Sequence, residues 1–143
     1  MKVIINPASG IERPILRPLN KVLREAGFAW DVDVTHGSSD AQRLAAAAVG
    51  DGYDTVMVYG GNGAVMEATA GLMGSGVPLA IIPGGTGNVL SVELGIENDV
   101  ARATELLTRE QIAVRDIDMG ECGEQRFALR IATGYEAAYV QHT

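Results

Sequence analysis

The chain has 143 residues, about the length of one domain, with 11 Lys plus Arg against 18 Asp plus Glu and a net charge of −7. Hydrophobic residues make up 47% of it, enough apolar material for one core, which argues against a disordered chain. The acidic balance argues against a non-specific nucleic-acid-binding protein, because such proteins need a basic surface, so we expect no nucleic-acid partner. The single cysteine, Cys122, excludes an internal disulfide scaffold and a Cys-rich zinc site.

The N-terminus and the longest apolar run bear on the cellular compartment. The first residues, MKVIINPASG, run directly into an apolar stretch and lack the layout of a signal peptide. The longest purely apolar run, residues 44–49, is far too short to cross a bilayer. We therefore expect a reduced, cytoplasmic protein.

Strand and helix patterns alternate along residues 1–110. Short apolar runs predict strands at residues 3–5, 30–34, 55–59 and 78–82. Helical spacing predicts a first helix at residues 14–26 and a second that starts at a serine cap, residue 38 or 39, and ends at 49. A third helix is predicted from the glycines after residue 60 to about residue 72. A short helix ending at residue 94 and another at residues 99–108 follow. In the first helix, either Pro14 starts the helix and Pro18 distorts its second turn, or the regular helix begins at Pro18. This alternation predicts an α/β fold of three layers, with a mainly parallel sheet covered by helices.

The last part of the chain has a different pattern. Residues 112–119 and 126–132 read as two strands joined by a turn at residues 120–123, which predicts a β-hairpin. We therefore expect an α/β domain over residues 1–110 and the incomplete start of a β-rich second domain over residues 111–143. An open sheet edge there favours self-association, so a homodimer is a possible assembly.

Glycine clusters follow the predicted strands. Residues 60–63 and 84–87 lie at strand-to-helix junctions, and residues 6–10 form a third, weaker loop. In a parallel sheet these junctions share the carboxyl edge, where glycines let backbone N–H groups approach a phosphate in front of a helix N-terminus. The alternative is that these glycines only make tight turns. The P-loop and dinucleotide-binding glycine patterns are both absent.

Several segments resemble the diacylglycerol kinase catalytic domain family. They are VIINPASG, like the family's Asn-Pro-x-Ser-Gly opening; VMVYGGNGAVMEATAGL, like its Gly-Gly-Asp-Gly-Thr segment; IIPGGTGNVLSVELGI, like its Pro-x-Gly-Thr-Gly-Asn segment; and DIDMGECGEQRFALRIATGYEAAYV, like the start of its second domain. Their order and spacing match over nearly the whole chain. The resemblance implies a fold like that of phosphofructokinases and NAD kinases, and the transfer of the γ-phosphoryl group of ATP to a lipid hydroxyl, as in phospholipid biosynthesis.

The resemblance also implies an ATP site, with Mg²⁺ as a second cofactor. Thr35 would reach the phosphates, the glycines after the third strand would cradle them, and Thr86 would contact the nucleotide from the last loop. For Glu67, a solvated acid on the helix face is the alternative to a ligand contact. The implied binding residues are Asn6, Ser9, Gly10, Thr35, Gly60, Gly61, Asn62, Gly63, Ala64, Glu67, Thr86 and Asn88.

The sequence departs from the family pattern at two positions. Asn62 stands where the family has Asp, and Ala64 stands where it has Thr. Because Mg²⁺ prefers carboxylate oxygen and neutralises charge during phosphoryl transfer, we expect weaker binding or turnover of Mg-ATP. The family's catalytic base lies in its second domain, so no catalytic residue is assigned here. Asp116 and Asp118 are acidic candidates, but strand-surface acids explain them equally well.

The alternatives for function stay open at this point. The first is the ATP-binding domain of a lipid kinase of the diacylglycerol type, inactive as this chain alone and acting on a lipid at a membrane surface in the full-length protein. The second is a non-catalytic nucleotide-binding module, and a third is an NAD kinase-like activity. A stripe of Arg13, Arg17, Lys21 and Arg24 could bring the protein to an anionic membrane as a peripheral protein, or be an ordinary solvated helix face.

Overall fold

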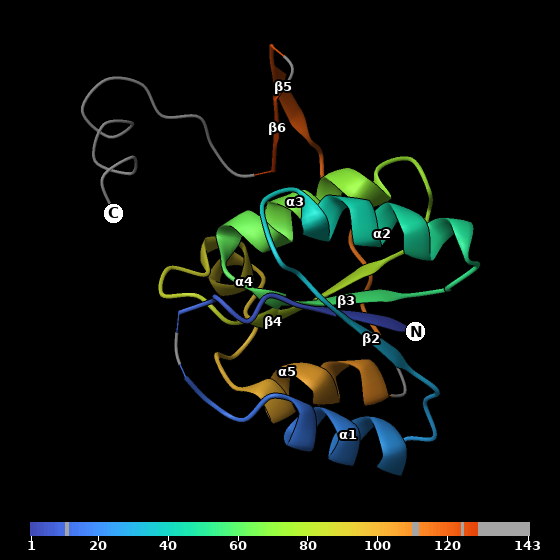
Figure 1. Ribbon diagram of the computed structural model, residues 1–143. Helices are drawn as coiled ribbons and strands as arrows, with labels where there is room; N and C mark the ends of the chain where they lie inside the picture. The colour runs from blue at the N-terminus through green and yellow to red at the C-terminus, as the bar shows by residue number, and fades with distance from the viewer. Residues whose placement is uncertain (11, 110–111, 124, 129–143) are drawn as a thin grey trace.

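The computed structural model describes residues 1–10, 12–109, 112–123 and 125–128. Its centre is a four-stranded parallel sheet in the order β2-β1-β3-β4 (Figure 1). The strands are β1 (Lys2–Ile5), β2 (Asp31–Val34), β3 (Val56–Gly60) and β4 (Leu79–Pro83). The predicted α/β fold with a mainly parallel sheet is confirmed. Each strand is followed by a helical segment, and between strands these segments return the chain to the end of the sheet where the parallel strands begin.

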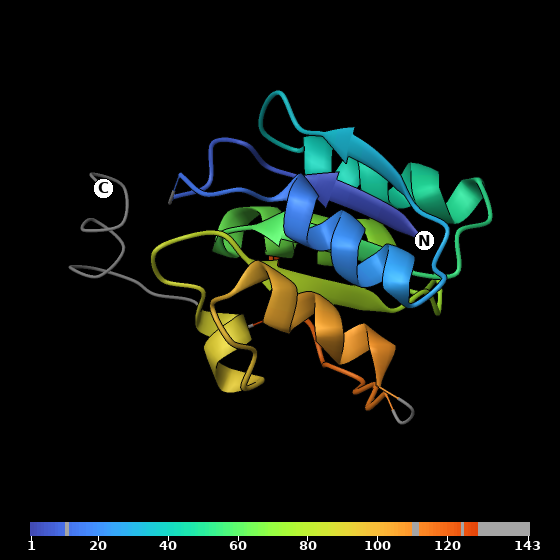
Figure 2. The ribbon, with the colours of Figure 1, turned by 90° about the horizontal axis from the view of Figure 1, so that it is seen from below.

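Helices cover both faces of the sheet. The helices are α1 (Leu16–Glu25), α2 (Asp40–Gly50), α3 (Asn62–Leu72), α4 (Val89–Glu93), α5 (Val100–Glu105) and the 3₁₀ turn η1 (Leu106–Thr108). In Figure 1, α2 and α3 lie on one face, while α1 and α5 lie on the other, where Figure 2 shows them side by side. The two faces bury separate apolar clusters, since alternate residues of each strand point to opposite sides. The result is the predicted three-layer arrangement.

The strands differ in burial as their sequences predict. All five residues of β3 are buried, because this strand lies inside the sheet and has an apolar sequence. The edge strand β2 alternates acids and valines. Asp33 forms an ion pair with Lys2 at 2.8 Å, and Asp31 accepts a hydrogen bond from the Tyr53 hydroxyl at 2.6 Å. Val32 stays 40% exposed, so even the apolar side of this edge is only half covered.

Helix α1 begins between the two alternatives for its start. Leu16 is its first residue, and the first intrahelical hydrogen bond runs from the N–H of Leu19 to the carbonyl of Ile15 at 3.2 Å. Pro18 therefore lies in the first turn, where a backbone N–H has no helical partner to lose. Gly27, with φ of +76°, ends the helix as predicted.

The C-terminal hairpin is present, but the predicted boundaries are wrong. Residues 112–119 pair with no strand among the described residues, and the hairpin consists of β5 (Gly120–Cys122) and β6 (Gln125–Phe127). Gly123, with φ of +62°, makes the turn. The ring of Phe127 lies against Gly120, and an added Cβ there would come within 2.2 Å of that ring, so glycine suits this strand position. Residues 129–132 of the predicted second strand lie outside the described residues.

The apolar residues of the predicted strand at 112–119 explain this error. Ile112, Val114 and Ile117 are 42–68% exposed, so the periodicity is present but no strand in the described part of the chain buries these side chains. The division into domains at residue 110 stays a prediction. No helix in the described part of the chain is both long and apolar enough to span a membrane.

Candidate functional site

The loops predicted to bind a ligand meet at one edge of the sheet. The parallel register pairs Ile5 with both Val34 and Tyr59, and it pairs Gly60 with Pro83. The four strands therefore end at the same level, and the segments that follow them lie next to one another. The sheet order thus brings together the glycine clusters that the sequence places at strand-to-helix junctions.

Three of the glycines allow the loops themselves to pack. The N–H of Gly84 donates to the carbonyl of Gly60 at 2.8 Å. A Cβ on Gly10, which has φ of +40°, would lie 2.8 Å from the carbonyl oxygen of Gly84, and a Cβ on Gly85 would lie 2.7 Å from the Cα of Gly61. Such distances are shorter than real Cβ contacts. For Gly10 and Gly85, close approach of backbone to backbone is therefore a sufficient reason for glycine, whereas a Cβ on Gly84 would lie 2.8 Å from the ring of Tyr59.

Side chains of three predicted site residues form hydrogen bonds at the rim, two of them between different loops. The Ser9 Oγ accepts a hydrogen bond from the N–H of Gly61 at 3.2 Å. The Asn62 Oδ1 accepts one from the N–H of Val89, the first residue of α4, at 2.8 Å. Asn88 accepts one from the N–H of Gly85 at 2.9 Å within its own loop. These polar groups hold the rim of the site together in the structure.

The N-terminus of α3 is the part of the site with open donors. Its N-cap, Gly61, makes no side-chain cap hydrogen bond, and the first main-chain bond runs from the N–H of Val65 to the carbonyl of Gly61 at 3.1 Å. The N–H groups of Asn62, Gly63 and Ala64 precede that bond and belong to the unpaired first turn of a helix. Gly63 is exposed, and an added Cβ would meet no atom within 4 Å. The helix dipole and these donors suit an anion.

The small side chain of Ala64 has a packing role. Ala64 is only 6% exposed, and a Cβ added to Gly60 would lie 2.6 Å from the Ala64 Cβ. Gly60 and Ala64 therefore pack in direct contact across the turn between β3 and α3. Their side of the turn is filled, whereas the side of Gly63 is open.

Asn6, Thr35 and Thr86 complete the predicted set. Asn6 Oδ1 accepts from the N–H of Ala8 at 3.0 Å, which shapes the first loop as an Asx turn. Thr35 follows β2, is 7% exposed, and donates its N–H to the carbonyl of Ile5 at 2.9 Å. Thr86 is exposed in the loop between β4 and α4. All three lie on segments that leave the same edge of the sheet.

Glu67 has a partner that neither interpretation of the sequence named. Its two carboxylate oxygens accept hydrogen bonds from the N–H groups of Ser39 at 2.9 Å and Ala41 at 3.2 Å, both at the start of α2. The carboxylate thus caps a neighbouring helix. A direct contact between Glu67 and a nucleotide stays a prediction.

Asp40 is a structural residue of the site that the sequence analysis did not single out. Its Oδ2 accepts from the N–H groups of His36 at 2.8 Å and Gly37 at 3.1 Å, and its Oδ1 pairs with Arg43 at 2.9 Å. The hydrogen bond from the backbone of His36, followed by that from Arg43, holds the pKa of the Asp40 carboxyl below its usual value. An acid just after the two serines at 38 and 39 was the available signal, and the predicted serine cap is wrong for Ser39, whose side chain makes no cap hydrogen bond.

Arg13 lies apart from the predicted basic stripe. It precedes α1, and its guanidinium donates to the carbonyl of Pro83, to the carbonyl of Asn98 at 3.0 Å and to its Oδ1 at 3.1 Å. The guanidinium also lies 5.6 Å from the centre of the Tyr59 ring. Arg13 therefore fastens the first loop to the end of β4, and the prediction of one four-residue stripe is wrong because the helix starts after it.

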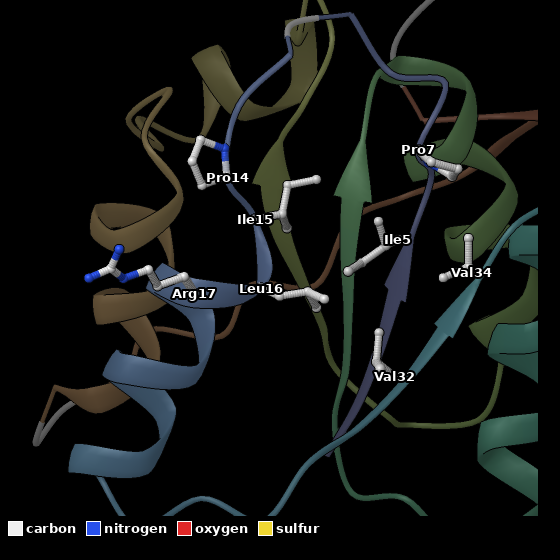
Figure 3. Close-up of a pocket in the computed structure, with 8 residues that line it drawn as sticks. All are labelled: Ile5, Pro7, Pro14, Ile15, Leu16, Arg17, Val32 and Val34. Atoms are coloured by element: carbon white, nitrogen blue, oxygen red, sulfur yellow. The ribbon is translucent and has the colours of Figure 1, made fainter.

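A groove of about 460 Å³ lies beside the rim, on the α1 face of β1 and β2 (Figure 3). Its lining is almost entirely apolar, with one cation at the edge. The lining residues are Ile5, Pro7, Pro14, Ile15, Leu16, Arg17, Val32 and Val34. The half-exposed valines of β2 form one wall of this groove.

The described residues supply no metal centre of their own. No group of three His, Cys, Asp or Glu side chains within them could hold an ion. Asp116 and Asp118 are exposed in the segment that precedes β5. Mg²⁺ is commonly held by one or two carboxylates together with substrate phosphates, so a site of that kind would depend on the phosphates of a bound substrate.

Comparisons with known proteins match this geometry to one family. The model of the diacylglycerol kinase catalytic domain matches residues 1–122. The chain is 39% identical to "Probable lipid kinase YegS-like" of Pseudomonas putida over 78% of this chain and 37% of that protein, and 39% identical to a protein of the same name from Xanthomonas campestris over 48% of this chain and 22% of that protein. A crystal structure of a diacylglycerol kinase from Bacillus anthracis superimposes with a TM-score of 0.73 and 30% identity, covering 88% of this chain and 44% of that one. The chain thus spans less than half the length of these relatives.

Proposed function

The chain belongs to the diacylglycerol kinase catalytic domain family, and from that premise we propose that it supplies the ATP-binding part of a lipid kinase. In the complete protein, a lipid hydroxyl would attack the γ-phosphorus of ATP, the bond to the β-phosphate oxygen would break, and ADP would leave. The lipid's proton would pass to a base outside this chain. The chain alone is expected to bind nucleotide without turning it over.

The observation that carries this proposal is the open first turn of α3. The N–H groups of Asn62, Gly63 and Ala64 lie at the carboxyl edge of the sheet, at the positive end of an eleven-residue helix. Gly63 leaves the approach clear, since nothing lies within 4 Å of the position of a Cβ. Main-chain donors of this kind bind phosphate in many α/β proteins.

The neighbouring loops would supply the remaining contacts. Thr35 and Asn6 leave the strands on one side of β3, and Thr86 leaves the strand on the other side. The hydrogen bond from Gly61 to Ser9 and the one from Val89 to Asn62 set the spacing of these loops before any ligand binds. Preorganised donors lose less conformational freedom on binding, which favours affinity.

Calorimetric titration of the purified chain tests the proposal. We expect saturable binding of ATP at one site, and no hydrolysis by the chain alone. Absence of ATP binding would refute the proposal. In the longer protein, ATP consumption with diacylglycerol or a sphingoid base would identify a lipid kinase, phosphorylation of NAD would favour the NAD kinase-like alternative, and binding without any transfer would favour a non-catalytic module.

A membrane surface is the proposed location of the lipid. Arg17, Lys21 and Arg24 are exposed on the outer face of α1, and Leu16 on its flank is 52% exposed next to the apolar groove. The chain has a net charge of −7, so three cations on one helix face form a local patch of positive charge that would attract an anionic membrane. Sedimentation with anionic but not neutral vesicles, lost in the double variant Arg17→Glu and Lys21→Glu, would support this location. No sedimentation at low salt would refute it.

Self-association is the remaining proposal about assembly. The parallel sheet leaves β2 with a neighbour on one side only within the described residues, and Val32 and Val34 are 40% and 42% exposed there. Unpaired strand edges of this kind invite pairing with another chain. Light scattering coupled to size-exclusion chromatography distinguishes a monomer from a homodimer.

A further inference from the structure

Helix α2 starts without a cap of its own. Its N-cap residue, Ser39, has φ of +66° and makes no side-chain cap hydrogen bond. A serine at this position normally satisfies an N–H of the first turn with its own hydroxyl. The local sequence therefore leaves the first donors of α2 in need of another acceptor.

Glu67 of α3 is that acceptor. Its Oε1 accepts from Ser39 at 2.9 Å and its Oε2 from Ala41 at 3.2 Å, so both oxygens of the carboxylate are used. The negative charge also lies at the positive end of the α2 dipole, which adds to the two hydrogen bonds. A contact across 28 residues of sequence thus replaces a local cap.

The two helices are also held at close range one turn further along. A Cβ on Gly71 of α3 would lie 2.3 Å from the carbonyl oxygen of Gln42 in α2. Figure 1 shows α2 and α3 side by side on one face of the sheet. Since Glu67 and Gly71 are four residues apart, they lie on the same face of α3, and both meet the first turns of α2.

The loop between β2 and α2 is consequently fixed at both ends. Thr35 at its start is tied to β1 through the carbonyl of Ile5 at 2.9 Å, and Ser39 at its end is tied to α3. Between them, Asp40 holds the N–H groups of His36 and Gly37. Only five residues, 35–39, separate the strand from the helix, so a shift of the α2 N-terminus must be absorbed within them.

We infer that Glu67 is a positioning residue for the proposed nucleotide site. It couples α3, whose first turn would hold phosphate, to the loop that carries Thr35. The distance between this loop and the first turn of α3, on the two sides of the site, is thereby fixed. Glu67 acts through the backbone of α2, where both of its carboxylate oxygens accept hydrogen bonds. This inference rests on the proposed function, because the loop matters only if a ligand lies between it and α3.

The variant Glu67→Gln tests the coupling, because glutamine keeps the shape but offers one acceptor oxygen and no charge. Amide hydrogen exchange should become roughly tenfold faster or more at Ser39 and Ala41, as expected from losing a hydrogen bond to a charged acceptor. The affinity for ATP at 25 °C, well below unfolding, should fall by about threefold to tenfold. The matched control is Glu25→Gln, the same change on an exposed side chain of α1, for which exchange at α2 and ATP affinity should stay as in the parent chain.

Two outcomes of the Glu67→Gln experiment overturn the inference. Unchanged exchange at Ser39 and Ala41 would mean that Glu67 does not hold the loop. Faster exchange with parental ATP affinity would mean that the contact only stabilises the fold. If the parent chain binds no ATP, the proposed function fails instead, and exchange still decides whether Glu67 holds the loop. A measurement without any variant adds a second check: ATP should slow exchange across residues 36–41 of the parent chain, and no change there on saturation would refute the coupling.

Discussion

Gly63→Ala should raise the stability of the fold and weaken nucleotide binding at the same time. Gly63 is the second residue of α3, its φ is not positive, and an added Cβ would meet no atom within 4 Å. Alanine therefore fits without strain and improves helix propensity, by about 0.5–1 kcal/mol. For a domain of this size, that gain corresponds to a rise in Tm of roughly 1–4 °C.

The same methyl group would occupy the space that the proposal gives to a phosphate. Losing one charge-assisted hydrogen bond costs about 1.5–3 kcal/mol. Since each 1.4 kcal/mol is a factor of ten, ATP affinity should fall by roughly tenfold or more. The two effects have opposite signs, so a general loss of folding cannot imitate the result.

Thermal denaturation and calorimetric titration of ATP measure the two quantities on one preparation. Gly50→Ala is the control, because Gly50 also lies in a helix, also has open space around its Cβ position, and ends α2 at the other edge of the sheet. It should raise Tm without changing ATP affinity. An ATP affinity in Gly63→Ala equal to that of the parent chain would refute phosphate binding at the first turn of α3. A lower Tm would refute the statement that a methyl group fits at position 63 without strain.

Three further predictions concern the rim of the site. Asn62→Asp keeps an acceptor for the first amide of α4 at its 2.8 Å contact, so Tm should change little while calorimetry shows tighter binding of Mg-ATP and weaker binding of ATP without Mg²⁺. Gly85→Ala places a Cβ 2.7 Å from the Cα of Gly61, and urea denaturation should show a loss of about 1–3 kcal/mol. The pKa of Asp40 is lowered by the N–H of His36, so its stabilisation is present above the ordinary carboxyl pKa and is lost as pH falls through the lowered value. Asp40→Asn should therefore flatten the fall in Tm below about pH 4.

Local patterns in the sequence were sufficient for most of the fold. The run Val56–Gly60 is apolar throughout and becomes the buried inner strand, and Gly27 ends α1 as its position after the apolar periodicity predicts. Both signals act within a few residues, through side-chain burial and backbone conformation. The same holds for the glycine clusters, which mark where the chain turns from strand to helix.

The segment at residues 112–119 shows where this reasoning fails. Its alternation of apolar side chains is that of a strand, yet Val114 is 68% exposed and the segment is unpaired among the described residues. A strand exists only when a second strand satisfies its hydrogen bonds, and periodicity carries no information about that partner.

Amino-acid order alone thus determined the alternating elements, the edge at which the loops gather and the kinship with lipid kinases. Tertiary structure decided which polar groups form hydrogen bonds with each other. Glu67 accepts from the start of a helix 28 residues away in sequence, and Asn62 from the start of one 27 residues away. Arg13 donates to Asn98, 85 residues away, and is not part of the predicted stripe. A donor and an acceptor become partners only when the order β2-β1-β3-β4 places their loops side by side. Hydrogen bonds act over about 3 Å in space, and no local pattern encodes a distance that the packing of whole elements creates.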